Sequence, residues 1–355
     1  MRELARLFFA TLGGVVLVYL VIDFADRAHG FTGRAWGRAA AELYLNKAAV
    51  VAYQLAPAAL IIAAALLITI LSRRGEMTAL LSLGVRPLRL AGPVALFAAA
   101  LGIALFWLGE KVVVRADARA EEIQVRRFNK WGDWATYHAG SSWIRGKQGR
   151  IYHLGQEHDG GWEPATVLEI AAPFRLSRRI DARRIEPAGP GRWRMLEAVE
   201  TRYALYGGPG GTIDEHRTDE LLESFPETPA DLELRSGRPQ QLPWRLLREQ
   251  VRRREQAGQR TIEYEVALAE RAAQPVQVIP ASLAALGLTL HLQRPRRRMP
   301  LAGAVALGMA LSMFLWAVSV VAHALSVGGS LSPLAAGAIP SLVSAALAVY
   351  AFWRG

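Results

Sequence analysis

The sequence contains no cysteine, and this absence removes several kinds of chemistry at once. Structural disulfides, thiolate metal sites and a cysteine nucleophile are all excluded. A nucleotide-binding P-loop is missing too. Its nearest approach, residues 140–147, has five residues between its glycines, and Gln148 stands where a hydroxyl is needed. We therefore expect that this chain does not bind ATP itself, and that any energy for work comes from elsewhere.

Motifs for hydrolysis and for metal-dependent catalysis are also absent. The sequence has neither a G-x-S-x-G elbow nor an H-E-x-x-H motif. Its seven histidines are scattered, and the closest pair, His153 and His158, matches no common zinc spacing. We therefore expect no catalytic residues, no metal site and no directly bound cofactor. A membrane-embedded hydrolase or transferase is disfavoured because no nucleophile, base and acid converge.

Positive charge is in excess, at a formal +11 over 355 residues, but it is not spread evenly. Eleven arginines and two glutamates at the two ends and in two short segments, residues 72–90 and 294–298, account for nine of these net charges. This asymmetry is what the positive-inside rule requires, and it predicts that both termini and both segments are cytoplasmic. A nucleic-acid partner is not expected, because no basic face or recognition motif is present.

Long apolar runs predict a membrane protein with six transmembrane helices. Residues 48–72 contain 25 uncharged positions and residues 90–109 contain 20, so both are long enough to span. The break at residues 326–333 divides the uncharged stretch 299–353 into two further spans. The remaining predicted spans are residues 7–22 and 272–293. The first could also be a signal peptide, but Asp23 and Asp26 interrupt any cleavage site, and we expect it to be retained.

The middle of the chain has a different composition, with charges, Gly and Pro turn signals, and short alternating segments. Residues 143–145 and 150–154 flank residues 146–149, which predicts a β-hairpin with a four-residue loop. Many short strands of this kind are typical of an antiparallel sandwich or jelly roll. We therefore expect spans one to three in residues 1–110, an inserted periplasmic jelly-roll-like β domain in 111–240, a periplasmic connector helix in 241–271, and spans four to six in 272–355.

The short segment between the second and third spans has its own pattern. Met77, Leu80 and Gly84 recur at helical spacing, while arginines and Glu76 surround them. This predicts an amphipathic helix at about residues 73–89. It could simply orient the protein and rest in the headgroups, and Glu76 could be favoured only by the helix dipole. Alternatively, it could dock a cytosolic partner, and the spacing alone does not separate these interpretations.

Several polar residues lie within or beside the predicted spans. Asp23 and His323 invite a functional interpretation, although the simpler one places both near the ends of spans. We expect Gln54, Gln274 and Gln277 to hydrogen-bond between helices and not to contact a ligand.

Taken together, these features resemble the LptF/LptG (YjgP/YjgQ) permeases of lipopolysaccharide export. The resemblance is carried by the order of three spans, a β domain and three spans, and by residues 74–86, in which Arg74 and Glu76 precede a small apolar helix that ends near Gly84 and Arg86. Further similarity lies in residues 23–26, 142–145, 150–152, 191–194 and 274–275.

The resemblance implies an ABC transporter subunit of the bacterial inner membrane. Such a permease pairs with a paralogous permease, and a cytosolic ATPase dimer that uses ATP docks on the loops between the second and third spans. Lipopolysaccharide would leave the surrounding membrane lipid. It would then pass along the β domains toward a periplasmic bridge protein. By position, Glu76 is similar to the acidic coupling residue of the family. The implied coupling residues are Arg74, Glu76, Met77, Leu80, Gly84 and Arg86.

The phosphates of such a substrate need basic partners near the outer end of the first span. Family members often carry lysines there, whereas this chain offers Arg27, with Arg34 and Arg38 farther on. These three arginines are the expected substrate-binding residues. The alternative function is a non-transporting scaffold or sensor whose β domain binds a periplasmic partner; such a protein would not need a carboxylate at position 76.

Overall fold

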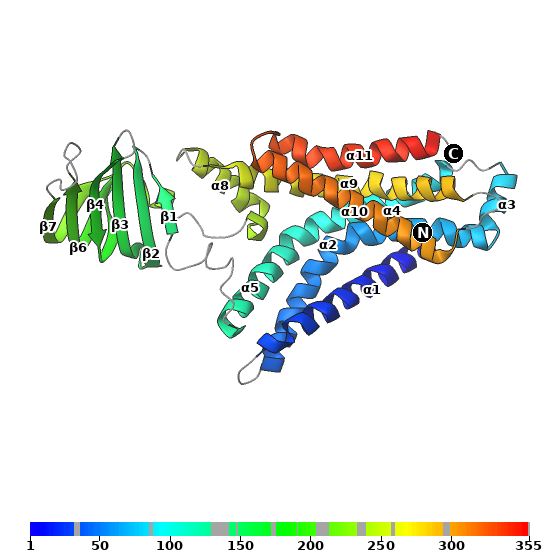
Figure 1. Ribbon diagram of the computed structural model, residues 1–355, viewed down its shortest axis with the longest axis horizontal. Helices are drawn as coiled ribbons and strands as arrows, with labels where there is room; N and C mark the ends of the chain where they lie inside the picture. The colour runs from blue at the N-terminus through cyan, green and yellow to red at the C-terminus, as the bar shows by residue number, and fades with distance from the viewer. Residues whose placement is uncertain are drawn as a thin grey trace. The chain divides into compact units, whose positions relative to one another are not determined.

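The structure is a computed structural model that describes residues 1–31, 36–84, 88–128, 142–146, 148–171, 175–189, 191–203, 213–232, 239–256, 260–293 and 299–353. The chain divides into two compact units (Figure 1). The first contains residues 1–130, 239–244 and 262–355, and the second contains residues 131–238 and 245–261.

The first unit is built from helices. They are α1 (Arg2–Arg27), η1 (Ala28–Gly30), α2 (Trp36–Arg73), α3 (Glu76–Ser82), α4 (Leu88–Leu108), η2 (Gly109–Val113), α5 (Val114–Phe128), η3 (Pro239–Gln241), α9 (Ile262–Leu292), α10 (Leu301–Val327) and α11 (Pro333–Trp353). Within the described residues, six helical stretches are long and apolar enough to cross a membrane. The six predicted spans are therefore confirmed.

Two of these helices extend well beyond the apolar runs that predicted them. The second run begins at residue 48, but α2 begins at Trp36. The third run ends at Gly109, but the helix continues through the π-helical turn η2 into α5 and ends at Phe128. The extensions pack on each other through a small apolar cluster that includes Leu43 and Ile123. This cluster explains why helix continues where the apolar run has stopped, since the extended parts of α2 and α5 bury their own side chains.

Close helix packing in this unit depends on small residues. The central cluster is rich in alanine, and α9 packs against α2, α4, α10 and α11. A Cβ atom at Gly102 of α4 would lie 2.5 Å from the Pro275 carbonyl oxygen of α9, and one at Gly308 of α10 would lie 2.8 Å from Ile62 of α2. Helices without a hydrophobic driving force between them associate through this kind of close approach.

The second unit contains an antiparallel sheet. Its strands are β1 (Ser142–Arg145), β2 (Arg150–His158), β3 (Gly161–Ala171), β4 (Arg175–Ala182), β5 (Arg184–Gly189), β6 (Arg192–Tyr203) and β7 (Ile213–Ser224). The helix α7 (Pro229–Leu232) follows, and α8 (Trp244–Gln256) lies between the sheet and α9 in the sequence. The predicted antiparallel β domain is confirmed, and so is the hairpin of β1 and β2, whose loop is closed by a 2.9 Å hydrogen bond from Gly146 N to Arg150 O.

The described strands pair as a meander. β4 and β5 together fill one position between β3 and β6, so each strand position pairs with the next one in the chain. The sheet packs around an apolar cluster in which Tyr152 and Trp193 are fully buried. Both bond to Glu227, with 2.6 Å from the Tyr152 hydroxyl to a carboxylate oxygen and 3.1 Å from Trp193 Nε1 to the backbone carbonyl. Burial raises the pKa of the Tyr152 hydroxyl, and its bond to Glu227 raises it further.

A buried ion-pair group joins β4, β6 and β7. Glu200 accepts hydrogen bonds from Arg178 Nε at 2.8 Å and from Arg202 Nε at 2.5 Å, and Arg178 also pairs with Glu223. Burial acts to raise the pKa of the Glu200 carboxyl, but the two guanidinium hydrogen bonds outweigh burial and hold the pKa below its usual value of 4.5. Since the folded state binds this proton more weakly than the unfolded state, the group stabilises the fold above the usual pKa.

We expect Glu200→Gln to destabilise the β domain by about 1.5–3 kcal/mol at pH 7, the contribution typical of hydrogen bonds to charged groups. The wild type should lose this advantage as the pH falls below 4.5 through the lower folded pKa, so the two proteins should converge in acid. Hydrogen exchange of β6 in the full chain, corrected for intrinsic rates, measures the difference. Glu220→Gln, which breaks an exposed pair with Arg194, is the matched control. Equal effects of both changes at pH 7 would contradict the prediction.

Candidate functional site

The helix α3 forms the connection between α2 and α4. Gly75 and Gly84 lie on either side of it, with φ angles of +77° and +75°. These are left-handed conformations that glycine adopts without strain, so the chain can turn sharply after α2 and again after α3. Gly84, one of the expected coupling residues, therefore has a role in ending the helix. Figure 1 shows α3 and both chain termini at the same end of the helical unit.

The side chains of α3 separate into a buried and an exposed set. Met77 is only 5% exposed and belongs to the central cluster of the bundle, together with Phe8 of α1 and Val94 of α4. Leu80 is half-buried, and the Glu76 carboxylate is 51% exposed. The helix is thus anchored in the bundle through Met77 while its carboxylate faces outward.

The charged residues around α3 make only weak contacts with one another. Arg74 lies 3.4 Å from Glu3 of α1 and 3.9 Å from Glu76, and all three side chains are about half exposed. Exposed pairs of this kind contribute at most about 1 kcal/mol, so Glu76 stays available to a stronger partner. Arg86 lies outside the described residues.

At the other end of α1, Asp23 is the centre of a polar cluster between α1 and α2. Its carboxylate accepts hydrogen bonds from Arg27 Nε at 3.1 Å, Tyr44 Oη at 2.8 Å and Lys47 Nζ at 2.5 Å. The side chains of Asp23 and Lys47 are 11% and 14% exposed, so this pair is largely withdrawn from solvent.

Of the three predicted substrate-binding arginines, the structure describes Arg27 and Arg38. Arg27 is held by Asp23, Arg34 lies outside the described residues, and Arg38 is exposed on α2 without an ion pair in the described part of the chain. The contact between Asp23 and Lys47 was not predicted from the sequence. The signal for it was that Lys47 directly precedes one apolar run and Asp23 directly follows the run before it.

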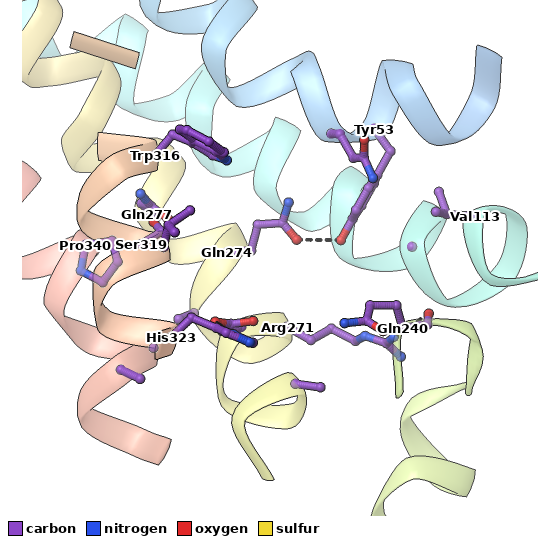
Figure 2. Close-up of a pocket in the computed structure, with 18 of the residues that line it drawn as sticks. Tyr53, Val113, Gln240, Arg271, Gln274, Gln277, Trp316, Ser319, His323 and Pro340 are labelled. Atoms are coloured by element: carbon purple, nitrogen blue, oxygen red, sulfur yellow. Dashed lines mark hydrogen bonds and ion pairs between the residues drawn. The ribbon is translucent and has the colours of Figure 1, made fainter. Parts of the chain in front are cut away.

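A cavity of about 490 Å³ lies among α2, η2, α5, α9, α10 and α11 (Figure 2). Its polar lining includes Tyr53, Gln54, Glu270, Arg271, Gln274, Gln277, Ser319 and His323. Gln274 bridges two helices as predicted, accepting a 2.6 Å hydrogen bond from Tyr53 Oη. The prediction is wrong for Gln54 and Gln277, whose side chains make no hydrogen bond with any described residue. His323 of α10 contacts Glu270 of α9, with 2.7 Å between Nδ1 and Oε1.

Beside this cavity, Arg271 of α9 connects three parts of the chain. It donates to Glu110 of η2 at 3.1 Å and to the carbonyl oxygens of Leu242 at 2.6 Å and Gln240 at 2.9 Å. Glu110 in turn accepts a 2.7 Å hydrogen bond from Trp244 N. The π-helical turn after the third span is therefore tied to the fourth span and to the segment that returns from the β domain in the sequence.

Residues 1–354 match the protein family described as lipopolysaccharide export system permease LptF/LptG. The chain belongs to this family. A comparison with curated proteins gives no match. Membership, together with six apolar helices and an antiparallel sheet in the middle of the chain, identifies a multi-pass inner-membrane permease subunit of lipopolysaccharide export.

In this permease, substitution of Asp23 tests whether its carboxylate stabilises the fold through Arg27 and Lys47. We expect Asp23→Asn to lower the melting temperature, because the largely buried ion pair between Asp23 and Lys47 is lost; breaking a buried pair costs up to about 3–5 kcal/mol. Adding Lys47→Met should restore much of the loss. Thermal unfolding of the purified chain measures both changes.

Asp26→Asn is the control for this substitution, because Asp26 is exposed and has no ion pair among the described residues. If Asp26→Asn and Asp23→Asn lower the melting temperature equally, the cluster does not stabilise the junction of α1 and α2.

Proposed function

We propose that this permease converts ATP hydrolysis by a separate cytosolic ATPase dimer into extraction of lipopolysaccharide from the inner membrane. In this proposal it pairs with a paralogous permease and passes the lipid to a periplasmic bridge protein. ATP is bound and used by the partner, and this chain holds no cofactor. The observation that carries the proposal is the anchoring of α3, with Met77 in the core of the bundle and Glu76 outside it.

The anchoring supports coupling for a mechanical reason. Protein interiors are close-packed, so a displacement of Met77 must be accommodated by the side chains around it. Met77 belongs to a cluster to which α1, α2 and α4 all contribute side chains, and α3 itself packs on α2. Movement of a partner bound to α3 would therefore reach several spans through one side chain. A helix that only rested in the headgroups would need no such anchor.

The orientation of the protein follows from charge. The start of α1 and the end of α2, which carry Arg2, Arg6, Arg73 and Arg74, lie at the end of the bundle that carries α3 and both termini (Figure 1). The positive-inside rule assigns this end to the cytoplasm and the β domain to the periplasm. On this assignment α3 faces an ATPase in the cytosol, and the Asp23 cluster lies near the outer leaflet, where phosphates of the lipid could meet Arg27 and Lys47.

Docking at Glu76 can be tested by co-purification with the ATPase and the paralogous permease. We expect Glu76→Arg to reduce the retained ATPase by about tenfold or more, because a charge-assisted hydrogen bond of about 1.5–3 kcal/mol is replaced by repulsion from a basic partner. The permease pair itself should stay intact.

Thr78→Arg is the control that adds the same guanidinium group at a neighbouring position, since Thr78 is exposed on the same helix. Undiminished ATPase binding by Glu76→Arg would show that the carboxylate only caps the helix. If no ATPase binds to the wild type, the scaffold or sensor function takes the place of transport.

A further inference from the structure

The exposed side of α4 leads to two cations just beyond the end of the third span. Ile103 and Trp107 are 73% and 59% exposed, so in a bilayer this side of α4 meets acyl chains. The uncharged run of the third span ends at Gly109. Lys111 and Arg115 follow it, and both side chains are exposed. An apolar surface on the span is therefore followed directly by positive charge.

These exposed side chains share one face of the helix. Four of them recur at intervals of four residues: Ile103, Trp107, Lys111 and Arg115. Residues three or four apart are neighbours on a helix surface, and α4, η2 and α5 continue as helix through this stretch. The π-helical turn η2 holds more residues than an α-helical turn, which offsets the sideways drift of a four-residue repeat. The two cations therefore lie one turn apart, in line with the tryptophan.

Neither cation has a carboxylate partner within the described part of the chain. Glu110, directly before Lys111, is committed to Arg271 at 3.1 Å, and the side chains of this pair are only 18% and 14% exposed. Asp117, two residues after Arg115, lines the cavity of Figure 2 and so lies on another side of the helix. On the orientation proposed above, Lys111 and Arg115 are at the outer end of their span, where the positive-inside rule disfavours basic residues. An anionic partner from outside the chain explains their presence there.

The depth of the two cations indicates the headgroup of a phospholipid. Lys111 lies about 3 Å along the helix axis from the end of the uncharged run, and Arg115 lies about 6 Å farther on. In a glycerophospholipid, only the glycerol separates the phosphate from the acyl chains, so the phosphate lies at this depth. Ammonium and guanidinium groups both donate charge-assisted hydrogen bonds to phosphate oxygens. Tryptophan is enriched at the same boundary, because its ring is apolar and its N–H is polar.

The net charge of the headgroup also matters. A zwitterionic headgroup carries an ammonium group of its own, which competes with the lysine and the arginine for the phosphate. An anionic headgroup has no such competitor, and two neighbouring cations attract it more strongly than one would.

We propose that Lys111, Arg115 and Trp107 form a binding site for an anionic glycerophospholipid that stays beside the third span. Its phosphate lies between the two cations, and its acyl chains lie along the exposed side of α4 that includes Ile103. The site is distinct from the Asp23 cluster and from α3, and it concerns a resident lipid, not the transported one. It therefore goes beyond the proposed function and does not depend on it.

The test measures which lipid lies against α4. Because the chain has no cysteine, Ile103→Cys can carry a single fluorophore in the full chain, reconstituted in nanodiscs of phosphatidylcholine. Phosphatidylglycerol or phosphatidylcholine with a nitroxide on the acyl chain is added as a quencher, so quenching reports the lipid at this position. We expect phosphatidylglycerol to be enriched about tenfold over phosphatidylcholine, since each cation contributes severalfold to binding of an anionic headgroup.

Charge variants show whether the two cations cause this enrichment. Lys111→Gln with Arg115→Gln should abolish it, whereas Lys111→Arg with Arg115→Lys should retain it within about twofold. The matched control is Arg192→Gln with Arg217→Gln, which removes two exposed cations of the β domain that have no ion pair among the described residues. The control should leave the enrichment unchanged. An equal loss in the control would show an effect of total charge and overturn the site.

Competition identifies the source of the phosphate. Soluble glycerol 3-phosphate in excess should leave the quenching within about twofold, because the acyl chains hold the lipid beside α4; full displacement would overturn the assignment to a lipid. Complete displacement by an equimolar phosphorylated, acylated glucosamine disaccharide would assign the site to the transported lipid and overturn a resident phospholipid. Equal quenching of the wild type by both nitroxide lipids would also overturn the site. The proposed function is unaffected by that last result, since binding of the ATPase at Glu76 is measured separately.

Discussion

A bilayer offers no water to polar groups, and this constraint governs the helical unit of the permease. Backbone groups are satisfied within helices, and some ionisable side chains find partners on other helices. Asp23 of α1 meets Lys47 of α2, Glu110 of η2 meets Arg271 of α9, and Glu270 of α9 meets His323 of α10. Each pair crosses between helices, so the polar groups fix which helices are neighbours.

Different side chains hold the elements together at the two ends of the helical unit. At one end, Met77 ties α3 to the bundle core while the Glu76 carboxylate stays open to a partner. At the other, Arg271 ties a π-helical turn to the chain segment that returns from the β domain. Such turns often mark functional sites because one extra residue distorts the hydrogen-bond ladder. An ATPase that moved α3 would act on helices whose far ends are joined by these ion pairs.

The sequence predicted those helices and strands in which buried side chains recur at a regular spacing. It did not predict burial that depends on contacts between residues far apart in the chain. Uncharged runs predicted the spans, and alternation predicted antiparallel strands. The helical extension after Trp36 was missed because its apolar face packs on α5, which no local pattern reveals. The Tyr53–Gln274 bond joins residues 221 positions apart, and only the folded bundle brings them together. The hydrogen bond from Arg27 to Asp23, four residues before it, was not predicted, although the two residues lie close together in the sequence.

The central claim is that α3 transmits movement into the bundle through Met77. The absence of native cysteine allows spin labels to be placed cleanly at Thr78→Cys on α3 and Ser330→Cys between α10 and α11. We predict that the distance between the labels, measured by pulsed electron resonance in the assembled transporter, shifts when the ATPase binds ATP. Met77→Ala should abolish the shift while the ATPase stays bound. A distance that does not respond to ATP, or that responds equally without Met77, would contradict the account.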